Sequence, residues 1–539
     1  MRILYLKNKY KRSVRLLPVL FCPLFLVLLI LPQFIFGFFP PVGTVVFFSI
    51  LFLISLFFSY FLNKEKFLLL VESRARLWLL LSGSFYAVFW IIFTVFWLDN
   101  FLFLGQNLIL FSQSLWSTMN AGMPLYNSIE GVLHFGIHNS PILLFFAPLY
   151  QIWPDPQALL FIRAVCLSLS IFPLYLIMRF NHSRAVSFIL SVSFLFYLPV
   201  LTQMLFDFQE IQFLPLILFF TYYFWKKKEF LAYMIFSLLC LFVREELSSI
   251  VFMFGVYSFI KKREWKWILT PILLGGIWGL LSFKLIIPFF SKNGQYYFNH
   301  IVFADLLKPD LNARPMIFQA NIQYLYWLLG PLLLILPFLN WEWILILPVL
   351  LGCLYTSYMP AKYIGSHYQM AAAAVFFISL GSGINYLSQK LQCWGMAQQK
   401  AKFSLALSVF LAVIAFSGAY YLGQARDFQK LTNSSPQVLR EAVGLVGPEG
   451  SFLGPRYVIN AKLNNRIYIY YCTEFFQPQG IFQDFVLIDG NTNDLLTKNS
   501  INKKFFPLIN HPDIYKKIFD QQGVQLYKLS LPKNSRNAD

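Results

Sequence analysis

Long apolar stretches recur along this chain and constrain its fold more than any other feature. A membrane-spanning helix needs about 20 apolar residues, and runs that approach this length occur throughout the first 422 positions. We expect 13 spans, with a margin of one or two because the three runs between 211 and 260 are short. The expected spans are 17–38, 43–62, 77–98, 157–178, 186–204, 211–225, 229–243, 247–260, 267–290, 322–339, 342–359, 369–388 and 403–422.

The composition supports the same class of protein. Only 12% of the 539 residues are charged and 58% are apolar, whereas soluble domains carry about 25% charged residues. Soluble globular, disordered, coiled-coil and disulfide-scaffold proteins are therefore excluded. The six cysteines form no CxxC pair and show no metal-ligand spacing. We expect an all-α polytopic membrane protein with a small C-terminal α/β domain.

The net charge of +19 would suggest a nucleic-acid partner in a soluble protein. In a membrane protein, an excess of Lys and Arg marks the cytoplasmic loops. With the N-terminus inside, the inner segments hold 22 of these residues and the outer segments before residue 423 hold five. We expect a multi-pass protein of the bacterial inner (cytoplasmic) membrane, with a cytoplasmic N-terminus, an extracytoplasmic C-terminal domain and no nucleic-acid partner.

Two outer loops are long, at residues 99–156 and 291–321. In the first, a helix is expected over 107–120, and the apolar run 141–153 is too short to span, so it predicts an interfacial or re-entrant helix. The composition changes near residue 423, and 423–539 contains no spanning run. In that tail the pattern predicts helices at 438–446 and 513–520 and strands at 466–471, 484–489 and 524–529.

Polar residues interrupt the apolar pattern mainly on the outer side. Ionisable groups at membrane depth are costly and usually face a cavity or a partner, so we expect one outer cavity that collects them. They are Asp207 and Glu210 between two spans, Arg244, Glu245 and Glu246 between two short helices, His138 before the apolar run, and His367 with Tyr368 in a short turn.

Structural roles account for the charged residues equally well. Asp207 with Glu210 three residues later fits a helix N-cap with a capping-box partner. Arg244 with Glu245 or Glu246 fits an internal ion pair between two short helices.

The remaining polar residues also have structural interpretations. His138 fits the start of a helix at Ser140-Pro141, and His367 and Tyr368 fit interfacial anchors.

The functional interpretation follows from the chemistry of these groups. Carboxylates hold a divalent cation such as Mg²⁺ or Mn²⁺, or act as a base, and a guanidinium grips phosphate through its planar fork. A membrane cavity with carboxylates, one arginine and an outer opening suits a lipid-linked phosphate whose tail stays in the bilayer.

Several short motifs resemble a known family. They are Gln113-Ser114-Leu115-Trp116, His138-Asn139-Ser140-Pro141-Ile142-Leu143 with Ala147-Pro148-Leu149-Tyr150, Asp207-Phe208-Gln209-Glu210, Arg244-Glu245-Glu246-Leu247, Glu441-Ala442-Val443 and Phe485-Val486-Leu487-Ile488-Asp489. In this order they resemble the bacterial membrane proteins of domain of unknown function 2079 (DUF2079), from about residue 95 to 530. That family looks like a branch of the C-type (GT-C) membrane glycosyltransferases.

The resemblance implies a fold and an activity. GT-C enzymes have many spans, a catalytic carboxylate in the first outer loop and often an outer C-terminal domain, and they transfer sugar from a polyprenyl-phosphate donor. By this resemblance, 77–98 is the first helix of a core over 77–422, and the two spans within 1–76 are an addition. Gln113 and Asn107 are then expected to contact the substrate.

The sequence departs from the family at the loop carboxylate. The family has acidic residues at the positions matched to Asn107 and Ser114, and residues 100–129 contain no Asp or Glu. An amide takes no proton at neutral pH, so a base cannot rest on Asn107. Either Asp99 or Asp207 supplies the carboxylate, or the chemistry is altered or lost.

The leading hypothesis is a GT-C-like protein that binds a polyprenyl-phosphate sugar and transfers the sugar to an acceptor. Asp207 is the expected base or metal ligand, Glu210 a supporting catalytic carboxylate, Glu245 and Glu246 metal ligands, and Arg244 the phosphate clamp. His138, His367 and Tyr368 are expected to contact substrate. Two alternatives stay open: a non-catalytic binder or translocator of lipid-linked sugars, and a proton-coupled transporter.

Overall fold

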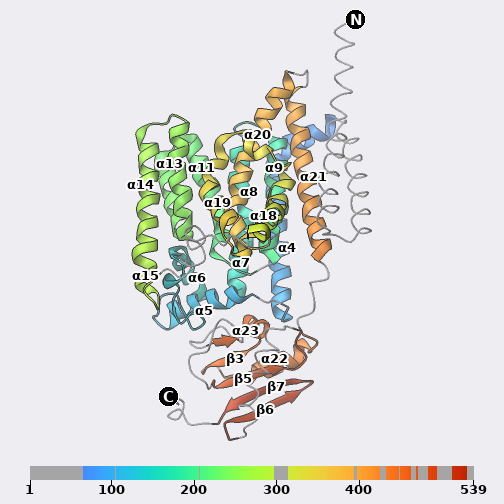
Figure 1. The fold of residues 1–539 in the computed structure, drawn as a ribbon. Helices are drawn as coiled ribbons and strands as arrows, with labels where there is room; N and C mark the ends of the chain where they lie inside the picture. The colour runs from blue at the N-terminus through green and yellow to red at the C-terminus, as the bar shows by residue number, and fades with distance from the viewer. Residues whose placement is uncertain are drawn as a thin grey trace.

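The fold was analysed in a computed structural model. It describes residues 65–102, 105–205, 207–295, 314–393, 397–424, 432–447, 450–462, 469–471, 483–493 and 513–530. A helical bundle occupies one part of the molecule and a β-sheet lies against one end of it (Figure 1). The expected spans 17–38 and 43–62 lie outside the described residues.

Within the described residues, five segments are long and apolar enough to cross a membrane. They are Val71–Asp99 within α4 (Glu65–Asp99), Pro156–Met178, which joins α7 (Pro156–Leu169) and α8 (Ile171–Met178), Trp265–Phe290, His367–Gln392 and Gln398–Tyr421. The last three contain α14 (Trp265–Leu281) with α15 (Ile287–Phe290), α20 (Met370–Gln392) and α21 (Gln398–Gln424). A sixth span results if α9 (Arg184–Phe196) and α10 (Leu198–Leu205), which meet at 44°, are one bent span.

The predicted total of 13 spans is not confirmed. Several predicted spans form helices shorter than the roughly 20 residues that cross a bilayer. These are α11 (Leu214–Lys227), α12 (Phe230–Val243), α13 (Ser248–Ile260), α18 (Arg314–Leu329) and α19 (Leu347–Tyr355). Prolines lie in the first turns of the short 3₁₀ helices η6 (Gly330–Leu332), η7 (Leu336–Leu339) and η9 (Met359–Lys362), where they interrupt longer α-helices because proline lacks an N–H.

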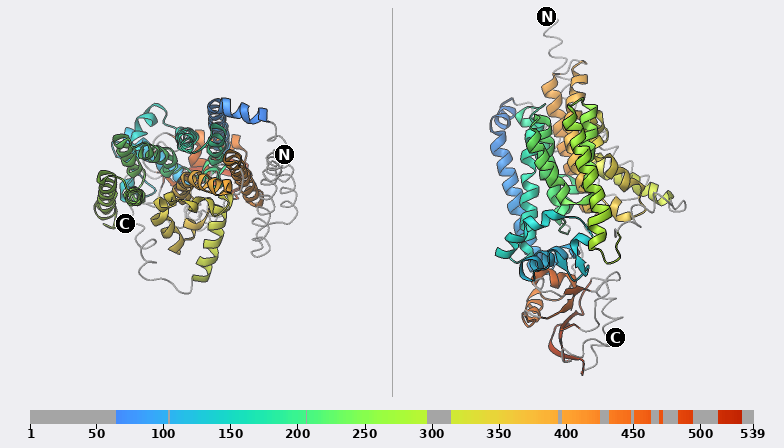
Figure 2. Two further views of the ribbon diagram at one scale, coloured as in Figure 1. Left: turned by 90° about the horizontal axis from the view of Figure 1, so that it is seen from above. Right: turned by 90° about the vertical axis from the view of Figure 1, so that its left-hand side faces the viewer.

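Burial separates the centre of the bundle from its rim. In the segment that contains α20, 83% of the apolar stretch is buried inside the protein, whereas in α4 the buried share is 28%. Gly383 permits the close packing of α20, because a Cβ there would lie 1.9 Å from the carbonyl oxygen of Leu336 on η7. At one edge of the bundle α13 and α14 pack side by side (Figure 2). Exposed Leu, Ile and Phe side chains on α4 and α14 give these helices an apolar outer face.

The first long loop lies between the bundle and the sheet. It contains α5 (Gln106–Asn120), a two-residue hairpin of β1 (Tyr126–Asn127) and β2 (Val132–Leu133), η1 (His134–Gly136), η2 (Pro141–Phe145) and α6 (Ala147–Ile152). Helix α5 confirms the helix predicted over 107–120. The run 141–153 forms two short helices rather than a span, and α5 and α6 lie at the sheet end of the bundle (Figure 1).

In its described segments, the C-terminal part of the chain forms a five-stranded sheet in the order β4-β3-β5-β7-β6. Strands β4 (Ile469–Tyr471), β3 (Phe452–Gly454) and β5 (Phe485–Asp489) are parallel, whereas β7 (Val524–Leu529) and β6 (Tyr515–Gln521) are antiparallel to their neighbours. Helices α22 (Pro436–Gly444) and α23 (Arg456–Lys462) accompany the sheet, and α23 contacts α4 and α5.

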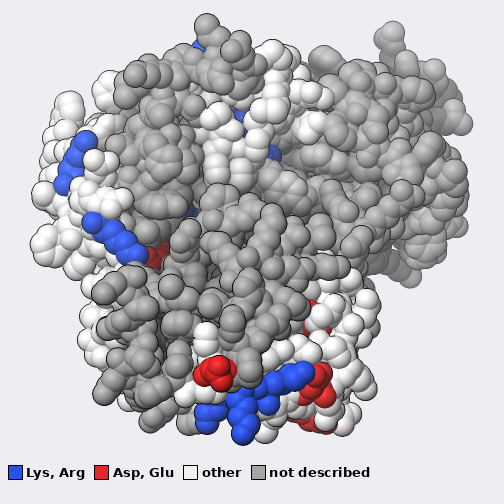
Figure 3. Space-filling view, turned by 60° about the horizontal axis from the view of Figure 1, so that its bottom comes forward, with Lys and Arg blue, Asp and Glu red and all other residues white. Residues whose placement is uncertain are grey.

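One prediction in this region is wrong. The segment 513–520, predicted as a helix, is largely strand β6, because it pairs with β7 across a tight turn. Gln522 and Gly523 in that turn both have positive φ, at 46° and 80°, as hairpin turns of this kind require. On the face of the molecule shown in Figure 3, charged side chains gather at the end formed by this sheet.

Candidate functional site

A break between α12 and α13 creates the centre of the candidate site. Helix α12 ends because Arg244 is extended, with φ −169° and ψ 149°. The short 3₁₀ helix η4 (Glu245–Leu247) then leads into α13. Arg244 and Glu245 are buried, with exposed fractions of 3% and 0%. Because the break falls inside the bundle, the chain holds a guanidinium and a carboxylate where buried charges need partners.

Arg244 has carboxylate and imidazole partners from three segments. Its Nε lies 3.1 Å from Oε1 of Glu246 and 3.5 Å from Oε1 of Glu210. Its Nη2 donates to Nε2 of His138 at 2.9 Å. The ion pair predicted between Arg244 and Glu246 is therefore present, and Glu210 and His138 join it as the sequence hypothesis of a shared site expects.

The contacts of His138 fix its tautomer. A guanidinium can only donate, so Nε2 is the acceptor and the ring proton lies on Nδ1. Nδ1 donates to Oε1 of Glu245 at 2.8 Å, and Oε2 of Glu245 accepts from the backbone N–H of Asn139 at 3.0 Å. The Asn139 side chain in turn donates to Ser282 Oγ at 2.8 Å. His138 therefore links Arg244 to Glu245.

The predicted site residues of the short turn lie beside this cluster. Tyr368 faces Arg244, with the guanidinium carbon 5.8 Å from the ring centroid, within the range of a cation–π contact. His367 stacks on Tyr368 with 4.1 Å between ring centroids. Nε2 of His367 is buried and has no hydrogen-bond partner within the described residues.

An apolar cavity of about 710 Å³ opens beside Arg244. Arg244, Glu246 and Tyr368 line it together with Ser248, Ser249 and Thr356. Leu351, Gly352 and other residues of α19 form much of its wall. Nη1 of Arg244 and Oε2 of Glu210 are both buried and have no hydrogen-bond partner in the described part of the chain. Nη1 can donate a hydrogen bond to a ligand, and Oε2 can accept one.

Asp207 has a different set of partners. Oδ2 accepts from the backbone N–H of Asn107 at 2.5 Å, and Oδ1 accepts from the N–H groups of Leu108 and Phe208, each at 2.9 Å. Asp207 therefore caps the N-terminus of α5, rather than the helix that follows it in sequence. Among the residues that the structure describes, no hydrogen bond or ion pair joins Asp207 to Arg244 or Glu245.

Asn107 and Gln113 also have structural contacts. Asn107 donates a hydrogen bond to Asp207 through its backbone N–H. The Gln113 side chain binds Ser128, donating from Nε2 to Oγ at 3.1 Å and accepting the backbone N–H at 3.0 Å. Both residues thus fix the ends and turns of the loop, and their predicted contacts with substrate stay predictions.

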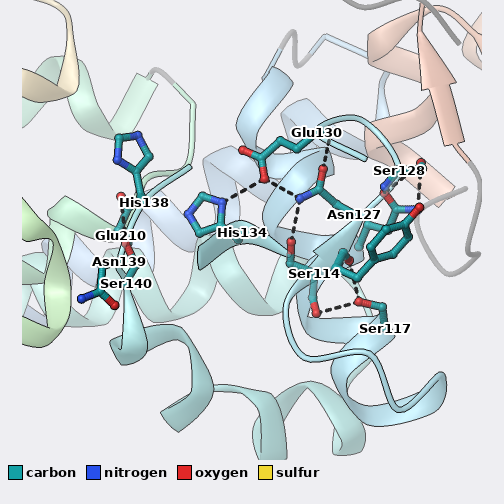
Figure 4. Close-up of polar contacts among 12 residues, drawn as sticks. Ser114, Ser117, Asn127, Ser128, Glu130, His134, His138, Asn139, Ser140 and Glu210 are labelled. Atoms are coloured by element: carbon teal, nitrogen blue, oxygen red, sulfur yellow. Dashed lines mark hydrogen bonds and ion pairs between the residues drawn. The ribbon is translucent and has the colours of Figure 1, made fainter. Parts of the chain in front are cut away.

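The sequence analysis missed a carboxylate–imidazole pair in this loop. Nδ1 of His134 lies 3.1 Å from Oε2 of Glu130, and the two side chains are 2% and 6% exposed. Asn127 donates to the same carboxylate oxygen at 2.7 Å and to Ser114 Oγ at 3.3 Å (Figure 4). Glu130 follows directly after the window 100–129 that contains no acid, and the spacing Glu130-x-x-x-His134 was the available signal.

The pair is adjacent to the Arg244 cluster. The rings of His134 and His138 lie 5.8 Å apart, measured between centroids. Burial disfavours the charged form of His134, but the nearby Glu130, Glu210 and Glu245 carboxylates outweigh it and raise its pKa above the usual value. A line of polar groups therefore runs from Ser114 through Glu130, His134 and His138 to Arg244.

The donor set gives a mixed test of the predicted divalent cation. Within the described ranges, no three His, Cys, Asp or Glu side chains are grouped to share a metal ion. Glu245 binds His138 and Asn139, and Glu246 pairs with Arg244. Oε2 of Glu210 has no hydrogen-bond partner among the described residues. The metal ion stays a prediction.

Comparison with known proteins identifies the family. Comparison with curated proteins finds no significant match. Among solved structures, the crystal structure of ArnT from Cupriavidus metallidurans bound to undecaprenyl phosphate is similar, with a TM-score of 0.47 and 9% identity over 84% of this chain and 97% of that one. A likeness this distant assigns no function. Residues 98–504 match the family model described as "Predicted membrane protein (DUF2079)", so the chain belongs to the DUF2079 family of membrane proteins.

Proposed function

We propose that this protein binds a polyprenyl-phosphate-linked sugar at the outer face of the bacterial inner membrane and transfers the sugar to an acceptor. One observation carries the proposal: Arg244, buried and with Nη1 unpartnered among the described residues, lines a largely apolar cavity. A ligand for such a site needs an anionic head and a long apolar tail. A lipid phosphate has both.

The second unpartnered atom favours a sugar on that phosphate. Arg244 Nη1 requires an acceptor, and Oε2 of Glu210 requires a donor. A phosphate oxygen supplies the first and a sugar hydroxyl supplies the second. The apolar wall from α19 then contacts the prenyl chain. Burial of the apolar surface of this chain stabilises the complex.

The charge balance supports the predicted cation. Arg244 is in contact with Glu210 and Glu246, and Glu245, the next residue along the chain, contacts His138. Three carboxylates outnumber one guanidinium, so a phosphate gains little attraction from the cluster alone. Mg²⁺ or Mn²⁺ bound to the phosphate would supply the missing positive charge.

Binding of radiolabelled undecaprenyl phosphate to the purified protein in nanodiscs tests the proposal. Arg244→Gln should lower affinity about 10-fold or more, since hydrogen bonds to charged groups contribute about 1.5–3 kcal/mol. Arg244→Lys keeps the positive charge but lacks the planar guanidinium, so its affinity should lie between those of wild type and Arg244→Gln. Arg440→Gln, an exposed arginine on α22, is the matched control. Equal binding by wild type and Arg244→Gln would overturn the proposal, and loss of binding in EDTA would support the cation.

A non-catalytic binder or translocator is the second candidate. It is favoured by the amide and the hydroxyl of Asn107 and Ser114, which stand where the family resemblance implies acids. Release of free undecaprenyl phosphate from undecaprenyl-phosphate sugars separates the candidates. A transferase releases it, whereas a binder retains the intact donor.

A further inference from the structure

A turn in the first long loop brings an acid back to α5. The hairpin pairs Tyr126 with Leu133 and Asn127 with Val132, and Gly131 in its turn has φ +64°. Glu130 precedes that glycine, so the turn directs its carboxylate toward Asn127. Asn127 donates to both Glu130 and Ser114 of α5. One side chain therefore separates the Glu130 carboxylate from the helix turn that carries Ser114.

The Glu130 carboxylate has one engaged and one unengaged oxygen. Oε2 takes both described contacts, from Asn127 at 2.7 Å and His134 at 3.1 Å. Oε1 has no hydrogen-bond partner in the described residues and, unlike Oε2 of Glu210, is not sealed from solvent. Asp207 differs, because both its oxygens accept backbone N–H groups. Glu130 can therefore accept a proton without breaking the contacts that hold it.

His134 orients this carboxylate and connects it to the phosphate site. Its ring packs edge-on against Phe111, with 5.0 Å between ring centroids. The centroid of the His138 ring lies 5.8 Å from that of His134. Nδ1 faces Glu130, and Nε2 is buried without a partner in the described part of the chain. His138 accepts from Arg244. Two imidazole rings thus lie between Glu130 and the guanidinium.

We propose that Glu130 is the general base of the transfer reaction and that His134 positions it. This inference rests on the proposed function. An acceptor hydroxyl gives its proton to Glu130 Oε1 and its oxygen bonds to the anomeric carbon of the sugar. The bond from that carbon to the phosphate oxygen breaks, and polyprenyl phosphate leaves with the electron pair, held by Arg244. Glu130 then loses the proton to water.

The experiment compares lipid binding with turnover in the same preparations. Wild type, Glu130→Gln, Glu130→Asp and His134→Gln are placed in nanodiscs. Each is assayed for binding of radiolabelled undecaprenyl phosphate and for its release from a panel of undecaprenyl-phosphate hexoses and pentoses, with a bacterial envelope extract supplying acceptor hydroxyls. Glu441→Gln, an exposed glutamate on α22, is the matched control.

Glu130→Gln should bind undecaprenyl phosphate within about threefold of wild type. Its release of undecaprenyl phosphate from the sugar donor should be slower by about 100-fold or more, since general-base catalysis contributes about 10²–10⁴-fold. Glu130→Asp should retain part of the turnover, and His134→Gln should shift the pH profile of the rate. Turnover by Glu130→Gln within threefold of wild type would overturn the inference.

Two further outcomes are informative. Wild type that binds the lipid phosphate but turns over no donor in the panel also overturns the base assignment, and leaves the protein a binder. Wild type that binds no lipid phosphate overturns the proposed function itself, and the inference with it.

Discussion

The carboxylate of Asp207 accepts a hydrogen bond from the backbone N–H of Leu108 at 2.9 Å, across 99 positions of the chain. This contact joins the turn after α10 to the first turn of α5. It satisfies N–H groups that no helix can satisfy internally, and it fixes the helix on which the first long loop is built.

Asp207→Asn should therefore destabilise the protein. The amide replaces one carboxylate oxygen with a donor that faces backbone N–H groups, which should cost about 1–2 kcal/mol. Thermal unfolding in detergent, with limited proteolysis of the loop 99–156, measures the effect. Asp520→Asn on the exposed face of β6 is the control and should stay within about 0.5 kcal/mol of wild type. An unchanged melting temperature with lost turnover would instead favour a catalytic Asp207.

Filling the cavity should block the lipid. Gly352 lines the cavity and a Cβ there meets nothing within 4 Å, so Gly352→Leu places its side chain in open space without a backbone clash. Binding of radiolabelled undecaprenyl phosphate should fall about 10-fold or more while the melting temperature changes little. Gly276→Leu, at a helical glycine that is equally open but away from the cavity, should bind normally. If both variants bind alike, the prenyl chain lies elsewhere.

The loop that carries both histidines depends on Gly136. A Cβ at this position would lie 2.4 Å from the carbonyl oxygen of Phe290, where backbone cannot yield cheaply. Gly136→Ala should cost about 1–3 kcal/mol through overpacking and should weaken lipid binding, since His138 moves with the loop. Gly444→Ala, where a Cβ meets nothing within 4 Å, is the control for thermal unfolding. Equal stability of both variants would show that the loop adapts.

The His134–Glu130 pair predicts a pH dependence of stability. Neighbouring carboxylates raise the pKa of His134 above its usual value of 6.5 in spite of its burial. A raised pKa in the folded state means that the pair stabilises the protein fully below about pH 6.5, and that this stability is lost as the pH rises through the higher folded pKa. The melting temperature of wild type should fall over that range more than that of His134→Gln. Parallel pH curves for the two proteins would argue against the pair.

The sequence predicted long helices well and short ones poorly. Residues 77–98 and 403–422 lie within continuous helices, because an apolar run of that length has few alternatives in a membrane. Segments such as 322–339 and 342–359 break into α-helical and 3₁₀ pieces, since tertiary packing and proline positions decide where a helix ends. The predicted helix 513–520 was wrong for a related reason: its pairing with β7 depends on a distant strand.

The site was predicted in part. The sequence indicated that Arg244, Glu210 and His138 would meet, because buried charges need partners, and they do. It could not show that Asp207 caps α5, a contact between distant segments. It also missed Glu130, because spacing along one helix face does not reveal a hairpin that folds an acid back onto that helix.

A structure determined in nanodiscs that contain undecaprenyl phosphate tests the central claim most directly. The account predicts density for a phosphate within hydrogen-bond distance of Arg244 Nη1, with its prenyl chain running along α19 past Gly352. A cavity without lipid density, or a phosphate bound at another part of the bundle, would contradict it.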